Sequence, residues 1–189
     1  NAKLYGNNLI VAIYQKSKNG VTIKNCNFDK FKKGIWLYYS KNNKIINNNF
    51  KSMGKHGLYL NWRCNNNEIR DNTFETANYG LELGGRSDNN LMFDNLFDHG
   101  LFTIGSESSG NKIYHNNFIN GVQVKDHNQN TWNLNQEGNY WYSFDSEEEF
   151  CFDNDKNGIC DNAYSGIISY QENKKSYDFF PFTQPNGWE

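Results

Sequence analysis

The chain contains 189 residues with a formal net charge of -2; 37% are hydrophobic, 16% are aromatic, and the mean hydropathy is -0.89. These values fit one domain with a thin core. No run approaches the roughly 18 apolar residues of a membrane-spanning helix, so we expect no membrane span in this chain. The 19 basic residues are balanced by 21 acidic ones, so we expect neither a concentrated basic patch nor a nucleic-acid partner.

Asparagine is the most unusual component, with 34 residues. Disordered chains are poor in aromatic residues, whereas this chain contains 5 Trp, 12 Tyr and 14 Phe. We therefore expect the chain to be ordered and the asparagines to have a structural role in it.

Internal repeats of about 21 to 24 residues run through residues 1–127. One block, with the pattern Ile-x-Asn/Asp-x-x-Phe, returns as 23–28, 45–50, 69–74, 92–97 and 113–118, with Met92 and His115 as the two departures. A second block, with Gly before alternating apolar residues, returns as 34–37, 57–60, 80–83, 100–101 and 121–124. Short alternating runs have the period of β-strands. Two or three such strands per repeat predict an all-β, right-handed parallel β-helix, a solenoid of about six coils.

Two columns of residues run through these repeats, one residue per coil. The corner column, where we expect left-handed backbone dihedrals, contains Asn25, Asn47, Asp71, Asp94 and His115. The aromatic column, expected to stack inside the coil, contains Phe28, Phe50, Phe74, Phe97 and Phe118. Because the chain starts at Asn1 without Met, we expect it to be a fragment with coils missing upstream.

Residues 128–189 lack the repeat and are predicted to form an aromatic and acidic C-terminal cap. A solenoid needs such a cover, because its last coil would otherwise present unpaired strand edges. The expected packing groups are Trp132, Tyr140, Trp141 and Phe144.

An acidic loop in this tail has the spacing of a continuous calcium loop. Oxygen ligands fall at positions one, three, five, seven and nine, with Gly158 at the sharp turn. The expected ligands of a structural Ca²⁺ are Asp153, Asp155, Asn157, Ile159 and Asp161. Position twelve is Tyr164 rather than the Glu of an EF-hand, so a further ligand must come from Asp178 or water. The alternative is a solvated acidic turn without metal.

The four cysteines divide into two kinds. Cys151 and Cys160 bracket the acidic loop, and a disulfide between them would suit an oxidising compartment. The alternative is two reduced thiols in a cytosolic protein. Cys26 and Cys64 lie on different parts of the repeat and are not expected to pair with each other.

Outward residues of the second strand predict a surface that spans the coils. One row contains Trp36, Tyr59, Glu82, Phe102 and Gln123; the next contains Tyr38, Asn61, Gly84, Gly105 and Lys125. At the adjoining corner, Ser40, Arg63 and Arg86 are expected to stack beside Tyr39, Trp62 and Gly85. Aromatic faces can carry sugar rings, so the candidate saccharide-binding residues are Trp36, Tyr38, Tyr59, Asn61, Trp62 and Glu82. The alternative is a flat surface that packs against a neighbouring surface-protein domain or protomer.

Catalysis and copper binding have weaker support in these residues. Glu82 with Arg63 and Arg86 is a weak catalytic candidate, because a hydrolase or lyase needs a second acid–base group. Soft metal ligands are dispersed among different repeats, namely Met53, His56, Met92, His99, His115 and His127.

The repeats resemble those of the NosD-like right-handed β-helix family, also described as the carbohydrate-binding and sugar-hydrolase (CASH) domain and related in fold to pectate lyases. The tail segments 138–141, 153–161, 163–164 and 177–182 are similar in order and type to the family's closing elements. This resemblance covers nearly the whole chain. It implies a β-helix fold and export, and therefore an extracellular, cell-surface or periplasmic location, but it leaves activity open.

Three functions remain after these observations. The first is an extracytoplasmic β-helix module, structural or glycan-binding, with a calcium-stabilised cap. The second is a carbohydrate-active lyase, epimerase or hydrolase that acts on the β-helix face. The third is an accessory protein for copper-enzyme maturation.

Overall fold

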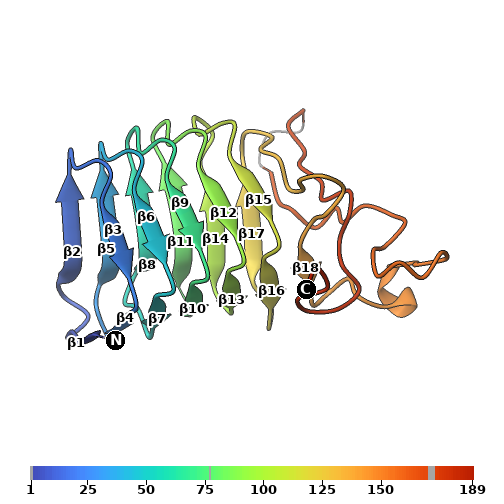
Figure 1. Ribbon diagram of the computed structural model, residues 1–189, viewed down its shortest axis with the longest axis horizontal. Coiled ribbons are helices and arrows are strands. Elements are labelled where there is room, and N and C mark those ends of the chain that lie inside the picture. Colours follow the sequence, from blue (N-terminus) through green and yellow to red (C-terminus); the bar gives the residue numbers. More distant parts are fainter. Residues whose placement is uncertain (1, 77, 170–172) are drawn as a thin grey trace.

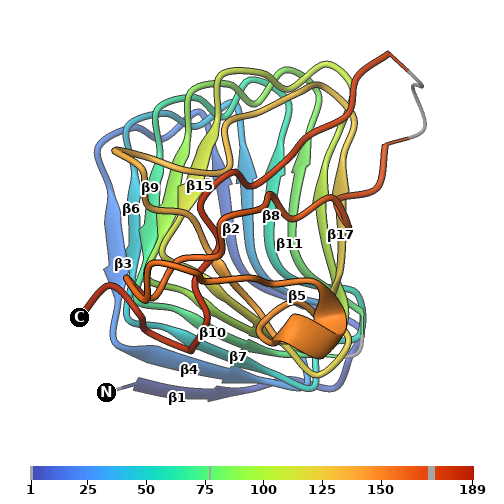
Figure 2. The ribbon, with the colours of Figure 1, turned by 90° about the vertical axis from the view of Figure 1, so that its right-hand side faces the viewer.

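The computed structural model describes residues 2–76, 78–169 and 173–189. The chain winds into a stack of parallel β-coils along the long axis of the molecule, and the tail folds over one end of the stack (Figure 1). Seen along the stack, the tail crosses the last coil (Figure 2). The predicted all-β parallel solenoid of about six coils is confirmed.

Each of the first five coils contributes one strand to each of three parallel sheets. Sheet A contains, in spatial order, β1 (Ala2–Tyr5), β4 (Cys26–Asp29), β7 (Asn49–Lys51), β10 (Thr73–Glu75), β13 (Leu96–Asp98), β16 (Asn117–Ile119) and β18 (Tyr140–Trp141). Sheet B contains β2 (Val11–Lys16), β5 (Lys33–Tyr38), β8 (His56–Asn61), β11 (Tyr79–Gly84), β14 (Leu101–Ile104) and β17 (Gln123–Asp126). Sheet C contains β3 (Thr22–Lys24), β6 (Lys44–Ile46), β9 (Glu68–Arg70), β12 (Leu91–Phe93) and β15 (Lys112–Tyr114). One short 3-10 helix, η1 (Glu147–Glu149), lies in the tail.

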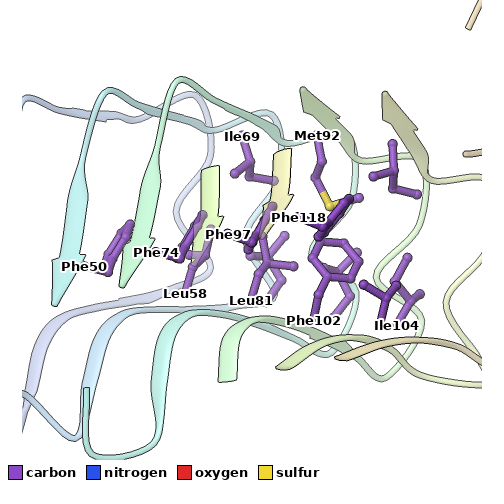
Figure 3. Close-up of a cluster of buried hydrophobic side chains, with 14 of the residues drawn as sticks. Phe50, Leu58, Ile69, Phe74, Leu81, Met92, Phe97, Phe102, Ile104 and Phe118 are labelled. Atoms are coloured by element: carbon purple, nitrogen blue, oxygen red, sulfur yellow. The ribbon is translucent and has the colours of Figure 1, made fainter. Parts of the chain in front are cut away.

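The phenylalanine column forms the predicted ladder inside the coils (Figure 3). Neighbouring rings are nearly parallel, with centroids 4.7 to 5.1 Å apart. This spacing follows from the roughly 4.8 Å separation of hydrogen-bonded strands. Trp141 continues the ladder into the tail, 4.4 Å from Phe118.

Glycine is required where sheet B closely approaches this ladder. A Cβ atom at Gly34 would lie 2.6 Å from both the carbonyl oxygen of Gly57 and the ring of Phe50. At Gly57 it would lie 2.7 Å from the carbonyl oxygen of Gly80. At Gly34 and Gly57 the repeated glycine of the sequence is therefore a packing requirement.

Two buried asparagine ladders connect the coils at the ends of sheet C. One contains Asn43, Asn67, Asn90, Asn111 and Asn130; the other contains Asn48, Asn72, Asn95, Asn116 and Asn139. In each step, one Asn donates its backbone N–H and its side-chain N–H to the side-chain oxygen of the Asn in the next coil. In the second ladder the amide also reaches backbone carbonyls, as Asn72 does with Ile45 and Arg70, both at 2.8 Å.

Each asparagine ladder ends on a buried carboxylate. The backbone and side-chain N–H groups of Asn130 donate to Asp126, and those of Asn139 donate to Asp178. A carboxylate accepts hydrogen bonds without having to donate one in turn, so it terminates a ladder that runs in one direction. Asp178 therefore has a structural role in the cap, and it is not positioned as a ligand for the acidic loop.

The corner column next to the second ladder has the predicted left-handed backbone. Its five residues have φ between 51° and 59°. Asn and Asp tolerate this region better than most residues, which explains their abundance here.

The tail pairs with the last strand of every sheet. β18 extends sheet A beside β16, Thr131 bridges to Lys112 in sheet C, and Ile168 bridges to Lys125 in sheet B. Trp132 and Trp141 are buried against the ladder, and their indole N–H groups donate to Asp126 and Asp178, each at 2.9 Å. These pairings cover strand edges that would otherwise be open.

Replacement of Asn72 by Ala tests the ladder. The change leaves the backbone N–H of Asn48 and the carbonyl of Ile45 without their partners, and each buried unpaired group costs roughly 1–3 kcal/mol. We expect a loss of at least about 2 kcal/mol in the free energy of unfolding, measured by urea denaturation. Asn27→Ala, on the outward face of β4, is the control and should change it by less than about 0.5 kcal/mol. Equal losses in both variants would refute the role of the ladder.

Candidate functional site

The outward face of sheet B carries the predicted residue rows over its first three repeats. Trp36 pairs with Tyr59, which pairs with Glu82. The row formed by Tyr38, Asn61 and Gly84 is likewise in register. These residues lie side by side on neighbouring strands, as the repeat pattern indicates.

The continuation of the first row differs from the prediction. Phe102 aligns with Leu81 and is fully buried, so Thr103 takes the outward place beside Glu82. The cause is an extra residue in β11, where Gly80 forms a bulge that β14 does not repeat. A shift of one residue moves side chains to the opposite face of a sheet. For the same reason Lys125, and not Gln123, follows Thr103 in this row.

The corner arginines do not join Glu82. Ser40 is buried, and its hydroxyl accepts from the backbone N–H of Lys18. In the following coils the backbone N–H groups of Cys64 and Ser87 donate to the hydroxyls of Ser87 and Ser108. Arg63 and Arg86 stand at the positions directly before Cys64 and Ser87, where the backbone is left-handed. Arg86 lies 3.9 Å from Glu107 and Glu82 binds His56, so the predicted constellation of Glu82 with two arginines is not assembled.

An aromatic cluster covers the first three coils of sheet B. The rings of Tyr14 and Trp36 are 4.6 Å apart, and those of Trp36 and Tyr59 are 6.1 Å apart. Tyr38 meets Trp36 edge to face at 6.4 Å. We call these four residues the aromatic face. Trp62, 38% exposed, lies in the turn after β8.

A histidine–glutamate pair borders the aromatic face, and our sequence reasoning did not find it. His56 is 1% exposed, and its Nε2 lies 2.7 Å from Oε2 of Glu82. Its ring stacks on Tyr59 at 4.5 Å and contacts Tyr79 at 5.0 Å. The residue directly before each repeated glycine forms its own outward column, which contains Lys33, His56 and Tyr79. Alignment of that column would have placed His56 beside Lys33 and Tyr79, in the column next to the Trp36 row.

Several polar atoms on this face are buried without a hydrogen-bond partner among the described residues. They include Nε1 of Trp36, Nδ1 of His56 and Oγ1 of Thr103. Buried polar groups are normally paired, and exceptions often mark a place where water or a ligand binds. Trp36 and His56 belong to the neighbouring strands β5 and β8, and Thr103 belongs to β14, with β11 between β8 and β14.

The electrostatics of the aromatic face depend on burial. Burial lowers the pKa of His56, an effect that the hydrogen bond to Glu82 opposes. Burial also lowers the pKa of Lys33 and raises that of Tyr59 to about 12. Near neutral pH, His56 is therefore neutral and donates from Nε2 to the Glu82 carboxylate.

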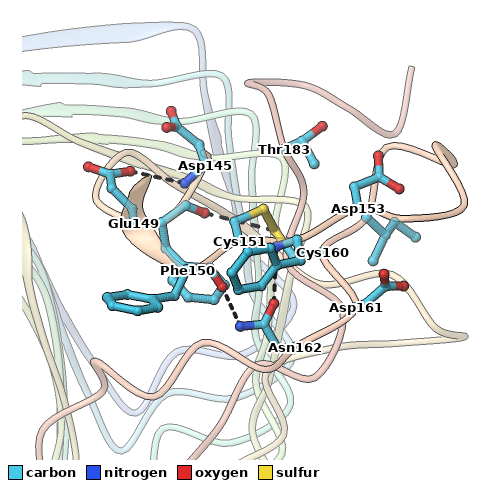
Figure 4. Close-up of a disulfide and its surroundings, with 12 residues drawn as sticks. Asp145, Glu149, Phe150, Cys151, Asp153, Cys160, Asp161, Asn162 and Thr183 are labelled. Atoms are coloured by element: carbon cyan, nitrogen blue, oxygen red, sulfur yellow. Dashed lines mark hydrogen bonds between the residues drawn. A yellow bond between two sulfur atoms is a disulfide. The ribbon is translucent and has the colours of Figure 1, made fainter. Parts of the chain in front are cut away.

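The acidic loop forms a compact turn beside the disulfide (Figure 4). The predicted Cys151–Cys160 bond is present, with Cα atoms 5.1 Å apart, whereas Cys26 and Cys64 are free thiols. Gly158 has φ +86°, which fits its predicted place at the sharp turn.

The loop carboxylates bind groups of the loop itself. Asp153 accepts from the backbone N–H groups of Asn157 and Gly158, both at 3.0 Å. Asp155 accepts from the Asn157 side chain at 3.0 Å. Hydrogen bonds from Asn154 lower the pKa of Asp161. Ile159, whose carbonyl is the fifth expected ligand, donates its N–H to Asn157 at 2.8 Å.

The described ranges contain no group of three or more His, Cys, Asp or Glu side chains arranged to hold a metal ion. Met53, Met92 and Cys64 are buried in the apolar core. His56 is bound by Glu82, and His115 by Glu137 at 2.8 Å. These soft ligands do not converge, and their arrangement does not fit a copper site.

The coil stack, the paired tail and the outward aromatic face define an extended parallel β-helix module. A family model described as "Periplasmic copper-binding protein (NosD)" matches residues 1–146, and the chain therefore belongs to the NosD family. No curated protein and no solved structure matches it significantly.

The family description supports an extracytoplasmic location, in agreement with the disulfide. No helix in the described part of the chain is long and apolar enough to cross a membrane.

The buried His56 predicts a defined dependence of stability on pH. Its pKa in the folded chain is below the unfolded value of about 6.5, so the unfolded chain binds more protons in the interval between the two. The stability due to neutral His56 is fully present above about pH 6.5 and falls as the pH drops towards the folded-state pKa. The facing groups are Glu82, Lys33, Lys55 and the two tyrosines.

We test this with His56→Gln, which keeps a side-chain N–H donor but does not titrate. The difference in unfolding free energy between the natural chain and the variant should shrink as the pH falls from about 7.5 to about 5.5. Urea denaturation at several pH values measures it. A difference that is constant or grows at low pH would contradict the assignment.

Proposed function

We propose that this extracytoplasmic β-helix module binds glycans along the aromatic face of sheet B. The observation that carries the proposal is the continuous row of rings from Tyr14 through Trp36 to Tyr59, with the unpaired indole N–H of Trp36 buried within it. Sugar rings present apolar C–H faces that stack on aromatic side chains, while their hydroxyl groups need polar partners. This face supplies both.

The polar partners flank the rings on adjacent strands. Asn61 is half-buried beside Tyr38, and Glu82 is half-buried beside Tyr59. His56 holds one oxygen of Glu82 and thereby fixes the position of its carboxylate. A saccharide that lies across the strands would meet a ring or a hydrogen-bonding group in each of the first three coils.

The enzymatic alternative requires a second acid–base group across the scissile bond. In the row from Trp36 to Lys125, Glu82 is the single carboxylate, and it is engaged by the buried His56. Release of shortened or unsaturated oligosaccharides, abolished in Glu82→Gln, would favour that alternative over a binding module.

Substitution of Trp36 tests glycan binding. Trp36→Ala removes the central ring of the aromatic face, and we expect glycans captured on an array to bind at least about tenfold more weakly. The matched control is Phe93→Ala, because Phe93 stacks on Tyr114 on the outward side of sheet C. Equal effects of the two substitutions would count against the aromatic face.

We also propose that the acidic loop binds Ca²⁺ and stabilises the cap. The support is the ligand spacing, the positive φ of Gly158 and the disulfide that closes the loop. Because the described carboxylates form no ready-made site, the ion must draw Asp153, Asp155 and Asp161 together. Ion binding would be favourable because it relieves the repulsion among these neighbouring negative charges.

Thermal unfolding with Ca²⁺ and with excess chelator tests this second proposal. Binding to the folded state alone should stabilise the chain by about 2.7 kcal/mol at a hundredfold excess over Kd and raise Tm. Asp155→Asn should abolish the rise, whereas Glu148→Gln, in the exposed helix η1, should preserve it. An unchanged Tm in the natural chain would contradict the proposal and favour an acidic turn without metal.

A further inference from the structure

Basic and acidic residues are segregated along the stack, contrary to the expectation drawn from their overall balance. Residues 1–67 contain eleven lysines and one arginine but a single carboxylate, Asp29. The remaining 122 residues contain seven basic and twenty acidic residues. The first three coils, which also carry the aromatic face, are therefore strongly basic.

Five of these lysines gather where sheet A turns into sheet B in two successive coils. We call Lys30, Lys32, Lys33, Lys51 and Lys55 the lysine corner. The backbone N–H of Lys30 donates to the carbonyl of Lys51 at 3.2 Å, and that of Lys55 donates to the carbonyl of Lys32 at 2.8 Å. Four of the side chains are exposed and Lys33 is half-buried. The coil register thus stacks lysine on lysine.

The charges of the lysine corner are mostly unneutralised. Among the described carboxylates, only Glu75 forms an ion pair with it, 3.5 Å from Lys51. Asp29 is a neighbour of Lys51 in the register of sheet A. Burial, and then the charge of Lys55, lower the pKa of Lys33; the carboxylate of Glu82 opposes this effect and Lys32 adds to it. A bound anion would relieve the repulsion among these ammonium groups.

Lys33 joins the lysine corner to the aromatic face. Its Nζ lies 3.8 Å from the ring centroid of Trp36 and 4.3 Å from that of Tyr59. These cation–π contacts hold the ammonium group directly above the rings. Because the ammonium group already covers these ring faces, a ligand that packs against the outward edges of Trp36 and Tyr59 would touch a positive charge.

We propose that the glycan bound by this face is an acidic polysaccharide. Its sugar rings pack against the outward edges of Trp36 and Tyr59, and its anionic groups bind Lys32, Lys33 and Lys55. The inference rests on the proposed function and adds the substrate class to it. A polyuronate fits best because it combines an apolar ring face and a negative charge in every residue of a linear chain, and each of these two coils presents an aromatic ring beside lysines.

The test compares two probes that share one backbone, one with charged carboxylates and one with neutral methyl esters. These are polygalacturonate and its fully methyl-esterified form, and titration of the natural chain with each should show tighter binding of the acidic form, weakened by added salt. Lys32→Gln/Lys33→Gln/Lys55→Gln should bind the acidic probe about tenfold more weakly. The matched control is Lys24→Gln/Lys41→Gln/Lys112→Gln, which removes the same charge from exposed positions on and beside sheet C and should bind as the natural chain does.

The outcomes separate this inference from the function on which it rests. Equal binding of both probes that depends on Trp36 but not on the lysine corner would overturn the inference and leave glycan binding intact. No glycan binding by the natural chain would overturn both. Tighter binding of single-stranded DNA than of polygalacturonate, lost in the corner variant, would assign the basic coils to nucleic acid instead.

Discussion

The buried asparagine amide is the interaction on which the coil stack depends. At each end of sheet C, the chain turns sharply inside the molecule, where unpaired backbone groups would be costly. The side chain of Asn72 accepts from the preceding coil while donating to the next coil and to two carbonyls, so one residue pairs several backbone groups. Each Asn donates to the Asn of the following coil, so the last Asn of the ladder needs an acceptor of another kind. Asp126 and Asp178 provide that acceptor because a carboxylate only accepts, which links the composition of the repeats to that of the tail.

The outward surface is a consequence of this stacking. Because the ladders and the phenylalanine rings hold the coils in register, equivalent residues of each repeat meet at the strand spacing. Trp36 and Tyr59 therefore form one face, and Lys32 and Lys55 form one corner, although each residue alone is an ordinary surface side chain. Similar side chains at equivalent positions of successive coils therefore form continuous rows on the surface. The register between coils also stacks the lysines of neighbouring coils on one another and places the carboxylate of Glu82 beside the buried His56.

The sequence predicted well what repeats in every coil and poorly what departs from the repeat. The Phe28-to-Phe118 ladder and the left-handed corner column follow from spacing alone, since each appears five times. The Cys151–Cys160 bond follows from a short separation. Phe102 was misplaced because the Gly80 bulge changes the register without interrupting the hydrophobic pattern. His56 was missed because it and Glu82 lie 26 residues apart, and only the exact coil length decides whether they face each other.

The amino-acid sequence by itself therefore determined the parallel coil stack, the phenylalanine ladder inside it and the disulfide of the tail. These are properties of period and composition. Only the tertiary structure decided which outward side chains touch, where the ladders end and which positive charges lie together. Those relations depend on registers between coils, where one inserted residue such as Gly80 exchanges inside for outside.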